Sequence, residues 1–339
     1  MADGHGKRDR VTIRAVAEEA GVSVAAVSKV LRNAYGVSEA LRQKVQAAID
    51  RLGYRPNVAA RGMRGQTFTI GILMNELTNP FLADLVDGVS AVLSPAGYKN
   101  LIGVGRAMEP LETGLIDSMI DYRMDGLVMI APRLGPDTLA RYAPQIPFVI
   151  IGHHEPAAIG FDTVNSDDRR GAQMVVEALL ARGHRDIGMI SLDLQTPHRS
   201  NVSDVREDGY LAAMAAAGLA DRARIDRMGL NPLPYDAELR AWLAAPDRPR
   251  AVFCWSDLHG IQLLNLAAEM GINVPRDLAV AGYDNSRTAA LSLVGLASVD
   301  QSGTAMGATA AELLLTRIAG RASAVHALVP PTLVVRRSL

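Results

Sequence analysis

Two patterns of apolar positions divide the chain near residue 67. Residues 11–55 place apolar residues at helical spacing between short turns, whereas from residue 67 short β-rich runs alternate with amphipathic stretches. This alternation predicts parallel sheets covered by helices, and about a dozen strands favour two similar lobes over one sheet. The expected strands lie at 69–73, 125–130, 148–151, 187–191, 251–254 and 278–282, and the expected helices near 80–96, 110–124, 167–182, 203–217, 234–245, 257–271 and 303–319.

The first pattern predicts a compact domain of three helices. Thr12 is a suitable N-cap for the first helix, and Gly21 is suited to end it. Ser23 begins a second helix over 24–32, and Ser38 begins a third. Two short helices joined by a glycine turn form a helix-turn-helix, whose second helix enters the DNA major groove. The positions expected to form the core are Ile13, Val16, Ala17, Ala20, Val27, Val30, Leu31, Val45, Ala48, Ile49 and Leu52.

The outward face of the second helix is the expected DNA-reading surface. Lys29 can donate to guanine or phosphate, and Ser23 or Ser28 can donate to phosphate. Val24 and Ala25 offer only apolar contact, for instance to a thymine methyl group. Thr12 is a further candidate contact at the start of the first helix. The alternative is that the three helices form a small bundle that binds a protein.

The distribution of charge favours DNA over a protein partner. Residues 1–66 hold 12 Lys or Arg and 6 Asp or Glu, a net charge of +6, while the other residues carry a net charge of −7. A basic head on a mildly acidic body indicates that the head meets a polyanion, and on charge alone the alternative is a basic face that contacts only solvent.

The remaining composition restricts the class of protein further. The single cysteine, Cys254, lies in an apolar run, so we expect a buried thiol and no disulfide. Residues 1–10 are polar and are expected to form a disordered lead. No run approaches the roughly 20 apolar residues of a membrane span. We therefore expect a cytoplasmic protein that makes no membrane contact.

Runs throughout the chain resemble the lactose-repressor/galactose-repressor (LacI/GalR) family of transcriptional regulators. In the head these runs are 12–17, 20–31, 37–39 and 52–57. In the body they are 70–72, 79–81, 182–184, 206–210, 256–257, 282–285 and 331–338. The resemblance implies an N-terminal all-α helix-turn-helix head and an α/β body of two doubly wound parallel-sheet lobes, similar to periplasmic binding proteins.

The resemblance also supplies expected domain bounds. The helix-turn-helix domain is expected at 11–56, a hinge helix and linker at 57–66, and an effector-binding and dimerisation domain at 67–339. Within the body, the N-lobe is expected at about 67–166 and 298–325, and the C-lobe at about 167–297 and 326–339.

Members of this family bind DNA as homodimers whose two heads read a near-palindromic operator. Their hinge helix inserts an apolar side chain into the minor groove. By alignment, the candidate hinge contacts are Asn57, Ala60 and Met63, and Met63 takes the wedge position that is usually Leu. Tetrameric members often carry a leucine-rich tail, whereas this chain stops at Leu339 without heptads. We therefore expect a dimer.

Polar residues follow the predicted strands of the body, where doubly wound sheets bind ligands. Acids, amides and one arginine suit a polyhydroxylated ligand, because a carboxylate accepts from two hydroxyls and a guanidinium donates as a fork. Arg206 and Asp284 are the strongest candidates, and Trp255 either stacks in the cleft or packs behind it. Carried over from the family position by position, the expected effector-binding residues are Asn75, Asn79, Phe81, Leu85, Gly152, Arg206, Ser256 and Asp284, to which we add Trp255.

Two other functions were weighed for the same body. A solute-binding protein for transport predicts a signal peptide and no helix-turn-helix, which is the reverse of this sequence. An enzyme needs a nucleophile or an acid–base pair in the cleft, for which Asp257 with Asp284 is the only candidate. Phosphate-loop and nucleophile-elbow motifs are lacking.

Metal and catalytic sites are not expected. His153 and His154 are the only paired metal-ligand candidates, and adjacent residues on an extended chain point in opposite directions. The Asp167–Asp168 pair sits at a predicted helix start, where negative charge is favourable in any case. We therefore expect a non-enzymatic regulator, most simply a repressor, without metal or cofactor and controlled by a sugar or sugar derivative. An activator with the same body is the alternative.

Overall fold

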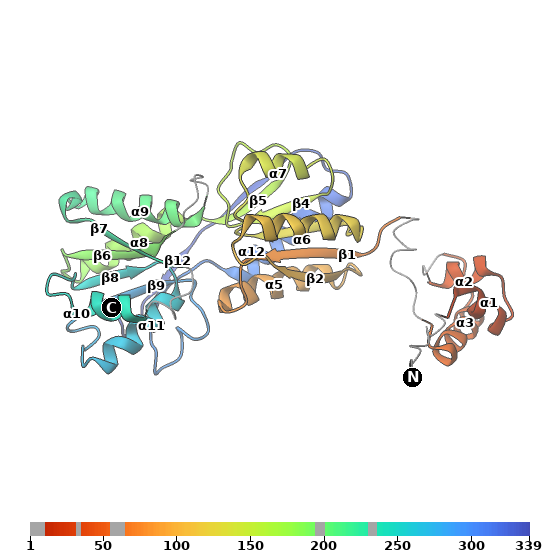
Figure 1. Ribbon diagram of the computed structural model, residues 1–339, viewed down its shortest axis with the longest axis horizontal. Helices are drawn as coiled ribbons and strands as arrows, with labels where there is room; N and C mark the ends of the chain where they lie inside the picture. Colours follow the sequence, from red (N-terminus) through yellow and green to blue (C-terminus); the bar gives the residue numbers. More distant parts are fainter. Residues whose placement is uncertain (1–10, 32–34, 55–64, 194–200, 230–235) are drawn as a thin grey trace, which may run out of the picture. The chain divides into compact units, whose positions relative to one another are not determined.

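The chain forms two compact units, Met1–Thr67 and Phe68–Leu339 (Figure 1). The computed structural model describes residues 11–31, 35–54, 65–193, 201–229 and 236–339. Among these residues, no helix has the length and apolar character needed to cross a bilayer.

The first unit contains the three predicted helices, α1 (Ile13–Glu19), α2 (Val24–Leu31) and α3 (Glu39–Leu52). The side-chain oxygens of Thr12, Ser23 and Ser38 each accept a hydrogen bond from the backbone N–H three residues later. Gly21 has φ +59°, which lets the chain turn sharply between α1 and α2. The predicted core positions Val16, Ala17, Ala20, Val27, Val30, Val45 and Ala48 are buried, and Ile13, Leu31, Ile49 and Leu52 pack partly buried against them.

The second unit contains two six-stranded sheets with the same kind of strand order. The first sheet is wholly parallel and runs β2 (Lys99–Val104), β1 (Thr69–Met74), β3 (Gly126–Ile130), β4 (Phe148–Ile151), β5 (Asp162–Ser166) and β11 (His326–Val329). The second runs β7 (Arg224–Met228), β6 (Ile187–Leu192), β8 (Ala251–Cys254), β9 (Ala279–Tyr283), β10 (Ala297–Asp300) and β12 (Thr332–Val334), of which only β12 is antiparallel.

Helices cover both faces of each sheet, and a buried apolar cluster lies on each face. The first sheet packs against α5 (Pro80–Leu93) and α12 (Gly303–Ile318) on one face, and against α6 (Glu109–Asp121) and α7 (Pro136–Tyr142) on the other. The second packs against α8 (Asp168–Ala181) and α9 (Val202–Ala216) on one face, and against α10 (Asp236–Ala244) and α11 (Asp257–Glu269) on the other. The body therefore has the predicted architecture of two doubly wound lobes.

The expected lobe boundaries near the C-terminus need correction. The segment 298–325 is expected in the N-lobe, but its first residues belong to β10, which pairs with β9 in the second sheet. The segment 326–339 is expected in the C-lobe, but its first residues form β11, which pairs with β5 in the first sheet. The chain therefore changes lobe between β10 and α12 and again between β11 and β12. Strand pairing decides this membership, and strands of only four residues, such as β10 and β11, carry no hydrophobic pattern that reveals their partner.

Candidate functional site

A cavity lies between the two sheets of the body, at the carboxyl ends of their strands. It contains about 790 Å³ of empty space, including the part open to solvent. Asn75 follows β1, Gly152 follows β4, Trp255 follows β8 and Asp284 follows β9. In each sheet the strand order reverses between two neighbouring strands, β1 and β3 in the first sheet and β6 and β8 in the second. Doubly wound folds bind ligands beyond the carboxyl ends of the strands at such a point.

Eight of the nine predicted effector-binding residues line this cavity: Asn75, Asn79, Phe81, Leu85, Gly152, Arg206, Trp255 and Asp284. Ser256 does not. It is fully buried at the start of α11, and its hydroxyl oxygen lies 3.0 Å from Nδ1 of His259. The structure therefore gives no support for a ligand contact at Ser256.

Arg206 of α9 lines the cavity and is held in place by hydrogen bonds to its neighbours. Its Nε–H donates to Asp168 Oδ1 at 2.7 Å, and its Nη1 donates to the Trp255 carbonyl oxygen at 2.8 Å. The guanidinium also lies 3.7 Å from the ring centroid of Tyr283, within cation–π range. Although burial opposes ionisation of both partners, Arg206 holds the pKa of Asp168 below its usual range, and Asp168 raises the pKa of Arg206.

Asp284 stands beside Arg206 and connects the two lobes. Its Oδ1 accepts from Gln301 Nε2 at 2.7 Å, and its Oδ2 accepts from Asn79 Nδ2 at 3.2 Å. Asn79 is the N-cap of α5, where its Oδ1 accepts from the Phe81 N–H. Burial raises the pKa of Asp284, and the positive charge of Arg206 opposes this rise. Asp284 also has φ +109°, an unfavourable conformation for a non-glycine residue that is common at functional sites.

The cavity lining also includes residues that the sequence did not predict, among them Asp168, Gln301, Arg133 and Ser203. Asp168 was attributed to the helix start alone, although it also pairs with Arg206. A polar residue just after a strand is a candidate ligand contact, and Asp168 lies two residues after the end of β5. The sequence of β5 is, however, too polar to be recognised as a strand.

A buried acid positions the cavity wall that follows β3. The Oε2 of Glu112 accepts from the backbone N–H of Arg133 at 2.8 Å. Burial raises the pKa of Glu112 to about 7, against the opposing effect of Arg133. Glu112 therefore fixes the backbone at Arg133, whose side chain lines the cavity.

Buried polar atoms of four lining residues have no hydrogen-bond partner within the described ranges. They are Asn75 Oδ1, Ser203 Oγ and Trp255 Nε1, and Ser166 Oγ is a fourth atom of the same kind. Because an unsatisfied buried polar group costs about 1–3 kcal/mol, their clustering indicates a site prepared for a polar ligand.

The predicted DNA-reading face is accessible on the first unit. Val24 is 40% exposed, and Ala25 and Lys29 are exposed beside it. Ser23 and Thr12 accept backbone hydrogen bonds as N-caps, which leaves their hydroxyl hydrogens free to donate to phosphate. Ser28 is half-buried. The hinge candidates Asn57, Ala60 and Met63 lie outside the described residues.

Known proteins match both units. The family described as "Bacterial regulatory proteins, lacI family" matches residues 12–57, and the "Periplasmic binding protein-like domain" matches residues 176–339. The chain is 32% identical to the "HTH-type transcriptional repressor PurR" of Erwinia tasmaniensis, over 97% of this chain and 96% of the relative. It is 31% identical to the PurR repressor of Escherichia coli O139:H28, with the same shares covered.

Solved structures agree with this assignment. A "transcriptional regulator CelR-cellobiose complex" superposes with a TM-score of 0.70 at 29% identity, covering 97% of this chain and all of that one. The "lac repressor dimer bound to operator and the anti-inducer ONPF" has a TM-score of 0.82 at 22% identity, covering 97% of this chain and 99% of that one, which shows the common fold. The full-length relatives are named as repressors, not as enzymes or transport receptors. This chain belongs to the LacI family of bacterial regulatory proteins, as a transcriptional repressor with a DNA-binding helix-turn-helix head and an effector-binding body.

Proposed function

We propose that this repressor binds a near-palindromic operator as a homodimer, and that an effector of the carbohydrate class in the cavity controls its operator affinity. The observation that carries the effector class is the set of unpartnered polar atoms beside Arg206 and Asp284. A polyol offers both donors and acceptors to these groups, and the apolar face of a sugar ring can pack on Trp255 or Phe81.

Coupling to DNA follows from the position of the cavity between the lobes. A ligand changes operator affinity only if it binds two lobe arrangements with different affinity. Ligand contacts to Asn75 on the first lobe and Arg206 on the second change when the lobes rotate. A coupling free energy of about 1–3 kcal/mol, typical of allosteric proteins, changes operator affinity roughly 5–150-fold.

Exposed apolar side chains support the homodimer. On the first lobe, Leu101 and Ile102 of β2 are 53% and 49% exposed. On the second lobe, Leu291 and Leu293 are 57% and 88% exposed. Large apolar residues gathered at a surface indicate a protein interface. As a DNA-binding regulator, the protein is expected to act in the cytoplasm.

The test measures binding of the full-length protein to DNA from the region upstream of its own gene, by fluorescence anisotropy. Neutral monosaccharides and disaccharides, including cellobiose, are added in turn, and sedimentation measures the oligomer. We expect DNA binding by a dimer and an altered affinity with one sugar. Ser203→Ala should weaken the response to that sugar, whereas Ser256→Ala, outside the cavity, should keep it. Binding of DNA that no sugar changes contradicts the carbohydrate effector, and a monomer or tetramer contradicts the dimer.

A further inference from the structure

A buried ion pair lies in the lining of the proposed effector cavity. The side chains of Arg206 and Asp168 are 3% and 1% exposed and lie 2.7 Å apart. The other carboxylate oxygen of Asp168 lies 2.8 Å from His154 Nε2. Both oxygens of Asp168 are therefore engaged, and its negative charge is fixed beside the only arginine at this end of the described lining.

The described lining contains more acidic than basic residues. Among the described lining residues, Glu76, Asp168 and Asp284 are acids, and Arg133 and Arg206 are the bases. Burial raises the pKa values of Glu76 and Asp284, which favours their neutral forms. Whichever form these two acids take, Asp168 matches the charge of Arg206, and Glu112 and Asp204 lie close enough to oppose the charge of Arg133.

We propose that Asp168 determines specificity by neutralising Arg206, so that the cavity takes uncharged polar ligands and rejects ligands carrying a carboxylate or phosphate. This inference rests on the proposed effector function of the cavity. Arg206 still has N–H groups for a neutral hydroxyl, because Asp168, Trp255 and Gln301 each occupy one of its five. It acts there as an oriented hydrogen-bond donor, not as an anion receptor.

The physical reason is the balance between desolvation and attraction. An anionic group that enters the cavity loses its hydration, which is costly unless a matching charge compensates it. The attraction from Arg206 is largely cancelled because Asp168 lies against the same guanidinium, and Asp284 adds repulsion whenever it is ionised. A neutral hydroxyl loses less hydration and needs no countercharge.

The test compares wild-type protein with Asp168→Asn in the absence of DNA. Binding of glucose, gluconate and glucose 6-phosphate is measured by calorimetry and by thermal shift. The wild type should bind gluconate and glucose 6-phosphate no better than glucose. Asp168→Asn should gain on the order of tenfold or more in affinity for at least one of the two anions, and this gain should shrink at high salt. The two anions separate carboxylate from phosphate chemistry.

The adjacent Asp167→Asn variant is the matched control. Asp167 caps α8 through the Arg170 N–H and does not line the cavity, so its replacement removes the same charge without the predicted gain. Wild-type protein that prefers either anion to glucose overturns the proposal. A folded Asp168→Asn protein that gains no anion affinity, or gains no more than Asp167→Asn, also overturns it.

A second variant keeps the test decisive if Asp168→Asn does not fold. Asp168→Asn with Arg206→Gln removes both buried charges and leaves no stranded guanidinium. This double variant should reject both anions as the wild type does, and a gain in anion affinity overturns the proposal. These measurements contain no operator, so a failure of sugars to change DNA binding counts against the proposed function alone.

Discussion

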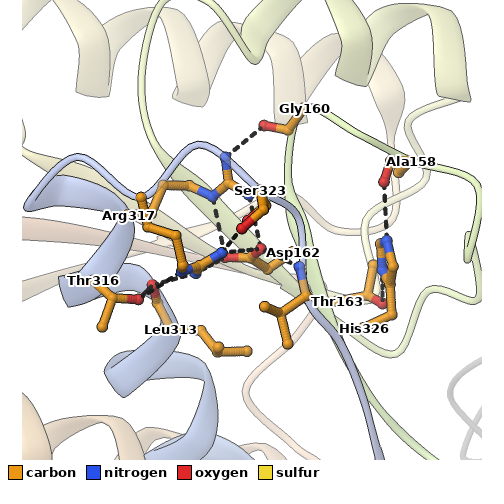
Figure 2. Close-up of polar contacts among 11 residues, drawn as sticks. Ala158, Gly160, Asp162, Thr163, Leu313, Thr316, Arg317, Ser323 and His326 are labelled. Atoms are coloured by element: carbon orange, nitrogen blue, oxygen red, sulfur yellow. Dashed lines mark hydrogen bonds and ion pairs between the residues drawn. The ribbon is translucent and has the colours of Figure 1, made fainter.

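Asp162 provides the sharpest test of the fold, because a single carboxylate holds three segments of the first lobe together. It begins β5 and is fully buried. Arg317 of α12 approaches this carboxylate (Figure 2). Arg321, just beyond α12, also pairs with it. Arg317 approaches as a fork, with Nε 3.1 Å from Oδ2 and Nη2 2.7 Å from Oδ1. The N–H of Val325, which leads into β11, donates to Oδ1 at 2.8 Å.

Replacing Asp162 with Asn keeps the shape and removes the charge. The guanidiniums of Arg317 and Arg321 are then left without their anion, and their side chains are only 9% and 21% exposed. Removing one partner from a buried ion pair costs about 3–5 kcal/mol. Because whole domains are stable by roughly 5–15 kcal/mol, this variant should lose a large part of the stability of the lobe.

Urea unfolding followed by circular dichroism and tryptophan fluorescence measures this loss. The control is Glu177→Gln, which removes an exposed ion pair with Arg170 and should cost about 0–1 kcal/mol. Adding Arg317→Met to Asp162→Asn should recover part of the loss, since one stranded cation is then replaced by an apolar side chain. A loss no larger than that of the control, or no recovery in the double variant, refutes this reasoning.

Three further predictions address acid stability, helix packing and DNA binding. Burial opposes ionisation of Asp162, but Arg317 and Arg321 lower its pKa to about 2 from 3.8. The contribution of Asp162 to stability is therefore present above pH 3.8 and is lost as the pH falls through 2. Urea unfolding over this range should show the wild type losing more stability than Asp162→Asn. Gly307→Ala should destabilise the protein by about 1–3 kcal/mol, because the new Cβ would lie 2.1 Å from the Leu85 carbonyl oxygen in α5. The control Gly114→Ala, on the exposed face of α6, meets nothing within 4 Å and should stabilise the protein by about 0.5–1 kcal/mol. Equal effects of the two variants in thermal denaturation contradict this packing. Lys29→Ala should weaken operator binding. If Lys29 contacts phosphate, the variant should also lower the slope of log affinity against log salt concentration by about 0.9. An unchanged operator affinity excludes Lys29 from the interface.

The sequence predicts the parts of this fold whose residues obey a local rule. The caps Thr12, Ser23 and Ser38 were found because an N-cap needs only a short polar side chain before an apolar helical period. Strands such as β4 and β8 were found because they lie at the centre of their sheets, apolar along their whole length and buried on both faces.

The parts that escaped prediction depend on partners far away in the chain. Strand β5 reads Asp-Thr-Val-Asn-Ser and looks like a loop, yet all five residues are buried. Asp162 is satisfied by two arginines more than 150 residues away, and Thr163 by His326 at 2.8 Å. Asn165 is satisfied by the backbone of His153. Burial of these polar groups is possible only because of distant hydrogen-bond partners, which no local pattern contains.

The same dependence on distant partners supplies a physical basis for the proposed coupling of ligand binding to lobe geometry. Asn79 belongs to the first lobe and bonds Asp284 of the second, and His154 of the first lobe approaches Asp168 of the second. Asp284 and Asp168 are joined in turn through Gln301 and Arg206. The network therefore begins and ends on one lobe and runs through the other, along the lining of the cavity. A ligand that replaces or reinforces any of these bonds would change the relative stability of the lobe arrangements, because the groups proposed to bind it also make the hydrogen bonds between the lobes.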